Sequence, residues 1–161
     1  MLFEMVTSEP LLSQAREIFR EYQLSLGIDL CFQDFEQELS TLPGKYAPPQ
    51  GRLYLAYIDG TLAGCIALRS FMEEQCEMKR LYVRPQFRGK NIGRLLANRI
   101  IADAKKIGYR QIYLDTLGTM TAAQELYRSL GFREISEYRF NPIDGTQYMG
   151  LDLQINNTQC K

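Results

Sequence analysis

The feature that constrains this chain most is a strand-like run that stops at a proline and leads through a short basic loop into a helix. The run covers residues 75–83, Pro85 follows it, and the loop covers residues 88–94. The first N–H groups of a helix have no intrahelical partner, and the helix dipole places partial positive charge beside them. The segment therefore predicts an anion site that suits a phosphate or pyrophosphate.

The order of residues in the loop narrows the choice of ligand. It reads Arg88, Gly89, Lys90, Asn91, Ile92, Gly93 and Arg94. A Walker loop needs G-x-x-x-x-G-K-[ST], and a dinucleotide fingerprint needs G-x-G-x-x-G after an apolar strand, so neither motif matches. The loop instead resembles the Arg/Gln-x-x-Gly-x-Gly/Ala coenzyme loop of the GNAT family of acyl-CoA-dependent N-acetyltransferases. Asn91 stands at the family's first glycine, and Asn is the non-glycine residue that best tolerates a positive φ.

A second segment carries the same resemblance. Residues 123–132 read A-Q-E-L-Y-R-S-L-G-F, which is similar to the family's A-x-x-L-Y-x-x-x-G-F helix and the strand after it. Both segments occur in the family's order, and the resemblance covers roughly residues 52–153. It implies the GNAT fold of the α/β class, a twisted, mixed central sheet of about six to seven strands with helices on both faces. We expect one N-acetyltransferase domain over residues 1–161, with a loose tail at 154–161.

The resemblance also implies a reaction, the direct transfer of an acetyl group from acetyl-CoA to a primary amine in a ternary complex. The pyrophosphate would sit on the basic loop, and the pantetheine arm would pair like an extra strand with the end of the run before it. A backbone N–H there would stabilise the developing oxyanion. The implied coenzyme-binding residues are Leu81, Tyr82, Val83, Arg88, Gly89, Lys90, Asn91, Ile92, Gly93, Arg94 and Ala123.

The resemblance assigns two catalytic roles. Tyr127 matches the family's general acid, a phenol that protonates the departing thiolate. Helical periodicity alone gives Tyr127 a different interpretation, as a core residue on a stripe with Leu126 and Leu130. Glu77 stands where some family members carry a glutamate that accepts the amine proton, usually through water. The alternatives are an ordered water without a fixed base, or a Glu77 that only pairs with Lys79 or Arg80.

Composition excludes several kinds of chemistry. The chain has no histidine, so Ser-His-Asp and Cys-His mechanisms and histidine metal sites are ruled out. Cys31, Cys65, Cys76 and Cys160 have no CxxC spacing and are expected to be reduced structural thiols, with no metal and no disulfide framework. There is no apolar run of membrane-spanning length and no signal-peptide pattern, so we expect a cytoplasmic protein without a membrane partner.

Charge gives a weak indication of partners. Lys plus Arg and Asp plus Glu both number 19, which does not support a nucleic-acid partner. The acceptor is expected to be a small-molecule or peptide amine, and Glu73, Glu74 and Glu77 hint at a cationic one. A homodimer is compatible with the resemblance. Two other functions stay open: a non-catalytic acyl-CoA-binding or regulatory domain on the same fold, and a nucleic-acid module that uses the basic residues between 84 and 106.

Apolar periodicity predicts the elements. Helices are expected at residues 11–26, 92–107 and 120–130, and a short one carries Phe32, Phe35, Leu39 and Leu42. Strands are expected at residues 52–58, 62–71, 75–83, 111–116, 132–138 and 147–153, with a tight turn at Asp59 and Gly60. The strand at 111–116 would lie parallel to the one at 75–83. This places the basic loop at the carboxyl end of a strand, where open α/β sheets bind ligands.

Overall fold

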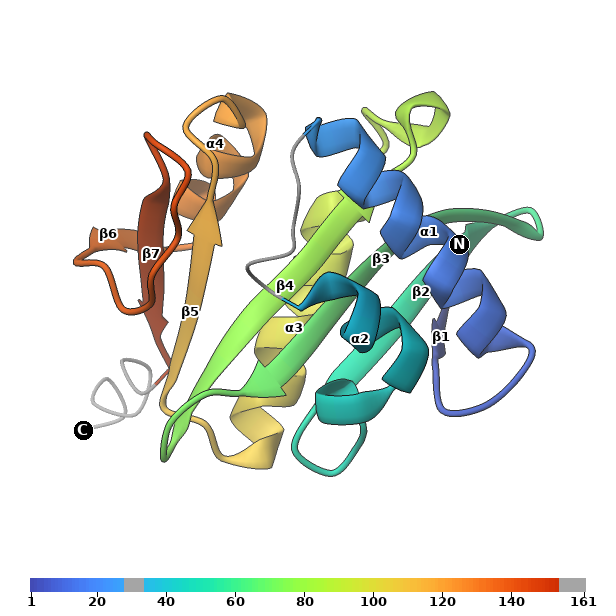
Figure 1. Cartoon of the computed structure of the whole chain (residues 1–161), viewed down its shortest axis with the longest axis horizontal. Helices are drawn as coiled ribbons and strands as arrows, with labels where there is room; N and C mark the ends of the chain where they lie inside the picture. The colour runs from blue at the N-terminus through green and yellow to red at the C-terminus, as the bar shows by residue number, and fades with distance from the viewer. Residues whose placement is uncertain (28–33, 154–161) are drawn as a thin grey trace, which may run out of the picture.

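The computed structural model describes residues 1–27 and 34–153 of the chain. Its strands are β1 Leu2–Met5, β2 Arg52–Ile58, β3 Thr61–Ser70, β4 Gln75–Val83, β5 Gln111–Thr116, β6 Arg133–Ile135 and β7 Gln147–Asp152. They form one seven-stranded sheet in the order β1-β2-β3-β4-β5-β7-β6 (Figure 1). Neighbouring strands are antiparallel except for β4 and β5, which are parallel. The expected mixed sheet is confirmed.

Helices cover both faces of this sheet, as expected. The helices α1 Leu11–Leu26 and α2 Phe35–Thr41 lie on one face, where Phe19 and Phe35 pack in an apolar core with Leu55 (Figure 1). The helices α3 Ile92–Ile107 and α4 Thr121–Ser129 belong to the core of the other face, which contains Leu96 and Ile100. Each amphipathic helix thus buries one apolar stripe against the sheet. Two short 3-10 helices, η2 Gly44–Tyr46 and η3 Pro85–Phe87, complete the described elements.

Some boundaries differ from the sequence prediction. The edge strand β1 was not expected, because its four residues show no alternation of buried and exposed positions. The strand expected at 132–138 is only the three residues of β6, which pair with residues 148–150 of β7. Phe32, expected on the second helix, and the expected tail at 154–161 lie outside the described residues. The single-domain organisation stays a prediction.

A β-bulge interrupts the regular pairing of β4 with β3. The register of β3 against β4 shifts between Cys65 and Ala67, where β4 has one residue more than its partner. Arg80 lies in this stretch with a left-handed φ of 62°. An extra residue bends a strand and increases its twist. On its other side, β4 pairs with β5 only as far as Glu77, opposite Tyr113, and the two strands separate beyond that point (Figure 1).

The side chain of Arg80 ties this bulge to α2. Its Nε and Nη2 atoms donate to the two carboxylate oxygens of Glu38, each over 2.9 Å. Its guanidinium also lies over the Phe35 ring, 5.3 Å from the centroid. A left-handed φ at a non-glycine residue is unfavourable by about 1–3 kcal/mol. The bidentate pair, whose side chains are 3% and 12% exposed, offsets that strain.

We expect Arg80→Met to lower the free energy of unfolding by about 3 kcal/mol or more, because it leaves the Glu38 carboxylate nearly buried without a partner. Urea denaturation measures this loss. Adding Glu38→Leu should recover most of it, since no unpaired charge remains. The control is Arg20→Met, whose ion pair with Glu36 is exposed on both sides and should stabilise the fold far less. A loss for Arg80→Met no larger than for the control would contradict the role of this pair.

Candidate functional site

A groove opens where β4 ends and extends to the basic loop and the start of α4. We call it the loop groove. Its lining includes Leu81, Tyr82, Val83, Arg88, Gly89, Asn91, Ile92, Gly93, Arg94 and Ala123. The coenzyme-binding residues predicted from the sequence therefore all line one groove, except Lys90, which is exposed and outside its lining.

The backbone of the basic loop turns sharply into α3. Gly89 has a φ of 84° and Asn91 a φ of 64°, so the positive φ expected at Asn91 is confirmed. The Leu95 N–H donates to the Asn91 carbonyl over 3.0 Å, which starts the helix and leaves the N–H groups of its first turn without intrahelical partners. Arg88 Nε donates to the Val83 carbonyl over 2.9 Å and fixes the loop to the end of β4. The arrangement can hold an anion.

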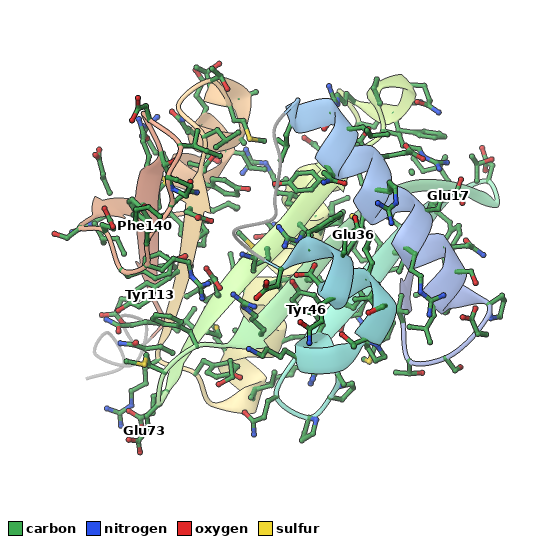
Figure 2. All side chains as sticks on the ribbon, viewed as in Figure 1. Glu17, Glu36, Tyr46, Glu73, Tyr113 and Phe140 are labelled. Carbon is green, nitrogen blue, oxygen red and sulfur yellow. The ribbon has the colours of Figure 1, made fainter. Side chains whose placement is uncertain are left out.

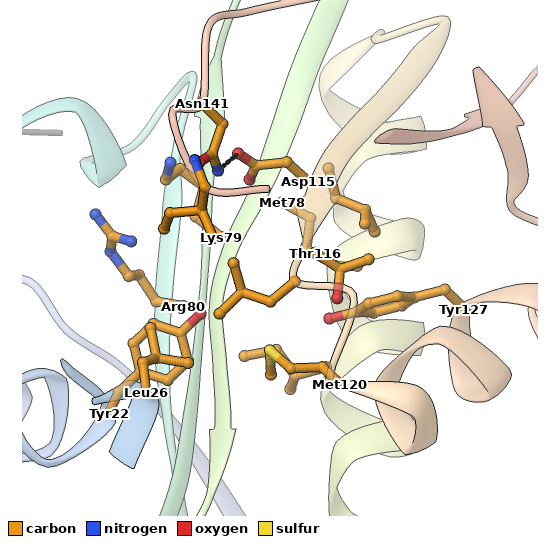
Figure 3. Close-up of a pocket in the computed structure, with 14 residues that line it drawn as sticks. Tyr22, Leu26, Met78, Lys79, Arg80, Asp115, Thr116, Met120, Tyr127 and Asn141 are labelled. Atoms are coloured by element: carbon orange, nitrogen blue, oxygen red, sulfur yellow. Dashed lines mark hydrogen bonds between the residues drawn. The ribbon is translucent and has the colours of Figure 1, made fainter. Parts of the chain in front are cut away.

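A narrow cavity of about 50 Å³ adjoins the loop groove, with which it shares Tyr22, Leu81 and Met120 (Figure 3). We call it the inner pocket. Tyr127 lines it and is only 8% exposed, with its ring edge-on to Phe132 at 5.8 Å. Burial raises the pKa of Tyr127, so its phenol is protonated at neutral pH. This is the state that a proton donor needs.

Thr116, at the end of β5, lies across the inner pocket from Tyr127. Figure 3 shows the hydroxyl ends of the two side chains pointing toward one another. Thr116 is 6% exposed, and its Oγ1 has no hydrogen-bond partner in the described part of the chain. A buried polar group without a partner is unfavourable by about 1–3 kcal/mol, so such groups mark places where a ligand or water binds. The sequence did not indicate Thr116, because strand periodicity predicts burial but not whether a hydroxyl is paired.

The opposite wall of the inner pocket is charged. Lys79 is 6% exposed; burial, with a further contribution from Arg80, lowers its pKa to about 8, although Glu77 and Asp115 act in the other direction. The Asp115 carboxylate accepts a hydrogen bond from Asn141 Nδ2 over 3.1 Å, drawn as a dashed line in Figure 3. The pocket therefore combines a protonated phenol, an unpaired hydroxyl and a lysine that titrates near neutral pH.

Glu77 lies outside the linings of both cavities and is fully buried. Its Oε1 accepts hydrogen bonds from Arg69 Nε at 3.0 Å and Arg139 Nη2 at 3.1 Å, and its Oε2 accepts one from the Tyr138 hydroxyl at 2.7 Å. Burial would raise the pKa of Glu77, but Lys79 and these partners outweigh it and lower the pKa. A carboxylate with this many donors is a weak proton acceptor, so the geometry favours a structural role. The base role stays a prediction.

The three glutamates that hinted at a cationic amine, Glu73, Glu74 and Glu77, do not form one acidic cluster. Glu74 pairs with Arg110 at 3.2 Å, where both side chains are about half exposed, and Glu73 is exposed at the edge of the molecule (Figure 2). Glu77 is buried among cations instead. Of the two residues considered as partners of Glu77, Lys79 acts on its carboxylate electrostatically, whereas Arg80 pairs with Glu38. The two arginines that form ion pairs with Glu77 come from β3 and from the segment after β6, which the sequence did not indicate.

Within residues 1–27 and 34–153, no three His, Cys, Asp or Glu side chains gather closely enough to hold a metal ion. No helix in those residues is long and apolar enough to cross a membrane. Cys65 and Cys76 are buried and unbonded, and burial raises the pKa of both thiols. They behave as the structural thiols that were expected. Cys31 and Cys160 lie outside the described residues.

Comparison with known proteins identifies the family. The model of the acetyltransferase (GNAT) family matches residues 12–132, which is most of the chain. The chain belongs to the GNAT family. The expected activity, that of an acetyl-CoA-dependent N-acetyltransferase, is thereby confirmed together with the GNAT fold, and a non-catalytic binding domain is not favoured.

Several relatives and solved structures are similar to this chain. An uncharacterized N-acetyltransferase of Schizosaccharomyces pombe is 42% identical over 144 residues, with 88% of each chain covered. An N-acetylaspartate synthetase of Mus musculus is 36% identical over 89 residues, which cover 55% of this chain and 30% of that protein. A GNAT acetyltransferase structure from Staphylococcus aureus aligns with a TM-score of 0.77 at 22% identity, over 94% of this chain and 99% of its own. A Salmonella typhimurium structure described with its cofactor acetyl-CoA aligns with a TM-score of 0.64 at 19% identity, over 94% of both chains.

The lowered pKa of Glu77 makes a prediction about stability. A carboxylate whose pKa is lower in the folded protein than in the unfolded chain stabilises the fold above the unfolded value of about 4.3. That contribution is lost as the pH falls through the folded pKa. Glu77→Gln should therefore lower the free energy of unfolding at pH 7, by roughly 3 kcal/mol, and by less near pH 3. Urea denaturation of both proteins at pH 7 and pH 3 measures the free energies of unfolding. If Glu77→Gln destabilised the fold equally at the two pH values, the lowered pKa of Glu77 would be contradicted.

Proposed function

We propose that this enzyme transfers the acetyl group of acetyl-CoA directly to a primary amine in a ternary complex, at the junction of the loop groove and the inner pocket. The observation that carries the proposal is the separation of β4 from β5 beyond Glu77. The Arg84 N–H donates to Ala63 on β3, so by strand alternation the backbone groups of Leu81 and Val83 face the gap. Pantetheine amides can pair with such an edge like an added strand.

The pyrophosphate of the coenzyme would lie on the first turn of α3. The unpaired N–H groups there, the helix dipole, and the guanidinium groups of Arg88 and Arg94 all favour an anion. Gly93 keeps this turn accessible. A Cβ at this position would lie 3.6 Å from a methyl of Leu126 and 3.9 Å from Val83, which is ordinary contact, so steric room for one methyl exists.

We expect Gly93→Asp to abolish acetyl-CoA binding, because its carboxylate would repel the pyrophosphate at the start of α3. The matched control is Gly93→Ala, which adds a Cβ in ordinary contact distance and should bind acetyl-CoA within a few-fold of the natural protein. Isothermal titration calorimetry measures both. Unchanged binding by Gly93→Asp would place the coenzyme elsewhere.

The chemistry begins when the amine nitrogen attacks the thioester carbonyl carbon. The carbonyl oxygen becomes an oxyanion, which a backbone N–H at the end of β4 can stabilise, an effect of about 3 kcal/mol where a donor has been removed. The carbon–sulfur bond then breaks, and the coenzyme thiolate takes the proton of the Tyr127 hydroxyl. Thr116 faces that hydroxyl and can donate a hydrogen bond to the phenolate that forms.

The proton of the attacking amine has two routes, to ordered water or through water to Glu77. The contacts of Glu77 favour the first route, because both of its oxygens already accept hydrogen bonds. The two routes differ in kinetics. Loss of a carboxylate base by Glu77→Gln would displace the alkaline-rising limb of the pH–rate profile, whereas loss of a structural anchor would not.

The acceptor is a small-molecule or peptide amine. Relatives named N-acetylaspartate synthetase make carboxylate-bearing amines one class to test. A homodimer and a cytoplasmic location remain predictions from the sequence.

Tyr127→Phe separates catalysis from packing, because it keeps the ring and removes only the hydroxyl. We expect this variant to fold and to bind acetyl-CoA almost normally, while kcat falls roughly 10²-fold or more with a smaller change in the amine KM. Steady-state kinetics alongside calorimetry measures these quantities. Tyr57→Phe is a matched control, since its hydroxyl donates to Gln14 on α1 and neither residue lines the loop groove or the inner pocket. If Tyr127→Phe kept the kcat of the natural protein, Tyr127 would be a packing residue of the core and not the proton donor.

A further inference from the structure

A second, wider cavity lies on the α2 side of the sheet. It has a volume of about 510 Å³ and is enclosed by α2, η2, the end of β3 and the segment between β6 and β7. We call it the α2 pocket. Its lining includes Thr41, Tyr46, Arg69, Phe71 and Arg139. None of the residues that line it belongs to the loop groove or the inner pocket.

Two buried donors in this lining have no acceptor. Tyr46 is 2% exposed, and neither its hydroxyl nor the Nε of Arg139 has a hydrogen-bond partner in the described part of the chain. Burial is the main cause of the raised pKa of Tyr46, and the nearby Glu38 carboxylate adds to it, although no hydrogen bond of ordinary geometry joins the two groups. Because the pKa is raised, the hydroxyl keeps its proton. Unpaired donors in the wall of a cavity favour a water or a ligand that accepts hydrogen bonds.

The charges around the α2 pocket leave one cation in excess. Arg69 and Arg139 share a single carboxylate, that of Glu77, at distances of 2.9 and 3.1 Å. The other charged groups compensate one another: Glu38 is paired with Arg80, and Asp34 and Lys45 are exposed at the rim with opposite signs. The Arg139 side chain is 29% exposed, so a ligand can reach its guanidinium. A single anionic group would neutralise this arrangement.

We propose that the α2 pocket binds a carboxylate of the acceptor, so that the natural acceptor is a small primary amine that carries a carboxylate. The inference rests on the proposed function. Arg139 and Arg69 bind the carboxylate, with the Tyr46 hydroxyl as a further donor, and guanidinium groups suit planar carboxylates.

The position of β4 relates this site to the reaction centre. Glu77, which anchors both arginines, and Lys79, which lines the inner pocket, are two residues apart on β4. Two strand residues span about 7 Å. Residues two apart on a strand lie on the same face of the sheet, so the anchor of the two arginines and Lys79 are neighbours on one face of β4. The proposal requires a small amino acid to extend from Arg139 toward Lys79 over a comparable length.

The test compares acceptors that differ only in charge. The probes are 4-aminobutanoate, 4-aminobutanamide and butane-1,4-diamine, with L-aspartate as a shorter amine that bears two carboxylates. Acetyl-CoA is held saturating, and kcat/KM is measured for each probe. We expect a carboxylate-bearing probe to exceed the neutral amide by roughly 10-fold or more, the usual effect of a hydrogen-bonded charge.

Variants then assign the preference to the pocket. Arg139→Gln should raise the KM of the preferred carboxylate probe roughly 10-fold, with little change in kcat or in the KM of the neutral amide. Tyr46→Phe, which preserves the buried ring, should raise the same KM by a smaller factor. Arg110→Gln, at an exposed ion pair with Glu74, serves as the control and should change neither KM.

Two kinds of result would overturn the inference, and they differ in whether acetyl transfer itself is also rejected. A preference for the amide or the diamine, or an Arg139→Gln effect equal for charged and neutral probes, would reject the carboxylate site while leaving acetyl transfer intact. If no amine were acetylated although acetyl-CoA bound, the proposed function and the inference would fail together.

Discussion

The ion pair between Arg80 and Glu38 holds β4 in a conformation that an arginine would not otherwise adopt. The bulge that it stabilises adds a residue to β4 without adding one to β3, in the part of β4 that no longer pairs with β5. The loop groove and the inner pocket both contain residues from this part of β4. A regular β4 would continue to pair with β5, and the backbone edge at Leu81 and Val83 would then be closed to a ligand.

In the proposed function, the two substrates meet different kinds of surface. For the coenzyme, the chain offers mainly backbone: a strand edge and the N–H groups at the start of α3. On the acceptor side it offers side chains, with Lys79, Arg69 and Arg139 around the buried Glu77. A glutamate near a reaction centre suggests a general base, but here its partners lower its pKa and occupy its oxygens. Its evident effect is to hold two arginines together, which concentrates positive charge where a carboxylate can bind.

The sequence predicted features that local rules determine. The turn at Asn91, the amphipathic pattern of α3 and the parallel pairing of β4 with β5 all follow from residues close in the chain. The contacts of Glu77 could not be predicted in this way, since Arg69 and Arg139 come from segments on either side of it in sequence. The unpaired hydroxyl of Thr116 could not be predicted either, because a hydrogen-bond partner depends on which groups lie nearby in three dimensions and not on burial alone. Local pattern thus located the residues of the loop groove, whereas the contacts around Glu77 emerge only from the tertiary structure.

Amide hydrogen exchange by NMR, with and without acetyl-CoA, tests the central claim most directly. If the coenzyme pairs with the edge of β4, the Leu81 and Val83 amides should exchange at least roughly 10-fold more slowly in the complex, together with the first amides of α3. Adenosine 3′,5′-diphosphate, which lacks the pantetheine arm, should not protect the β4 amides. Unchanged exchange at Leu81 and Val83 in a saturated acetyl-CoA complex would contradict the account.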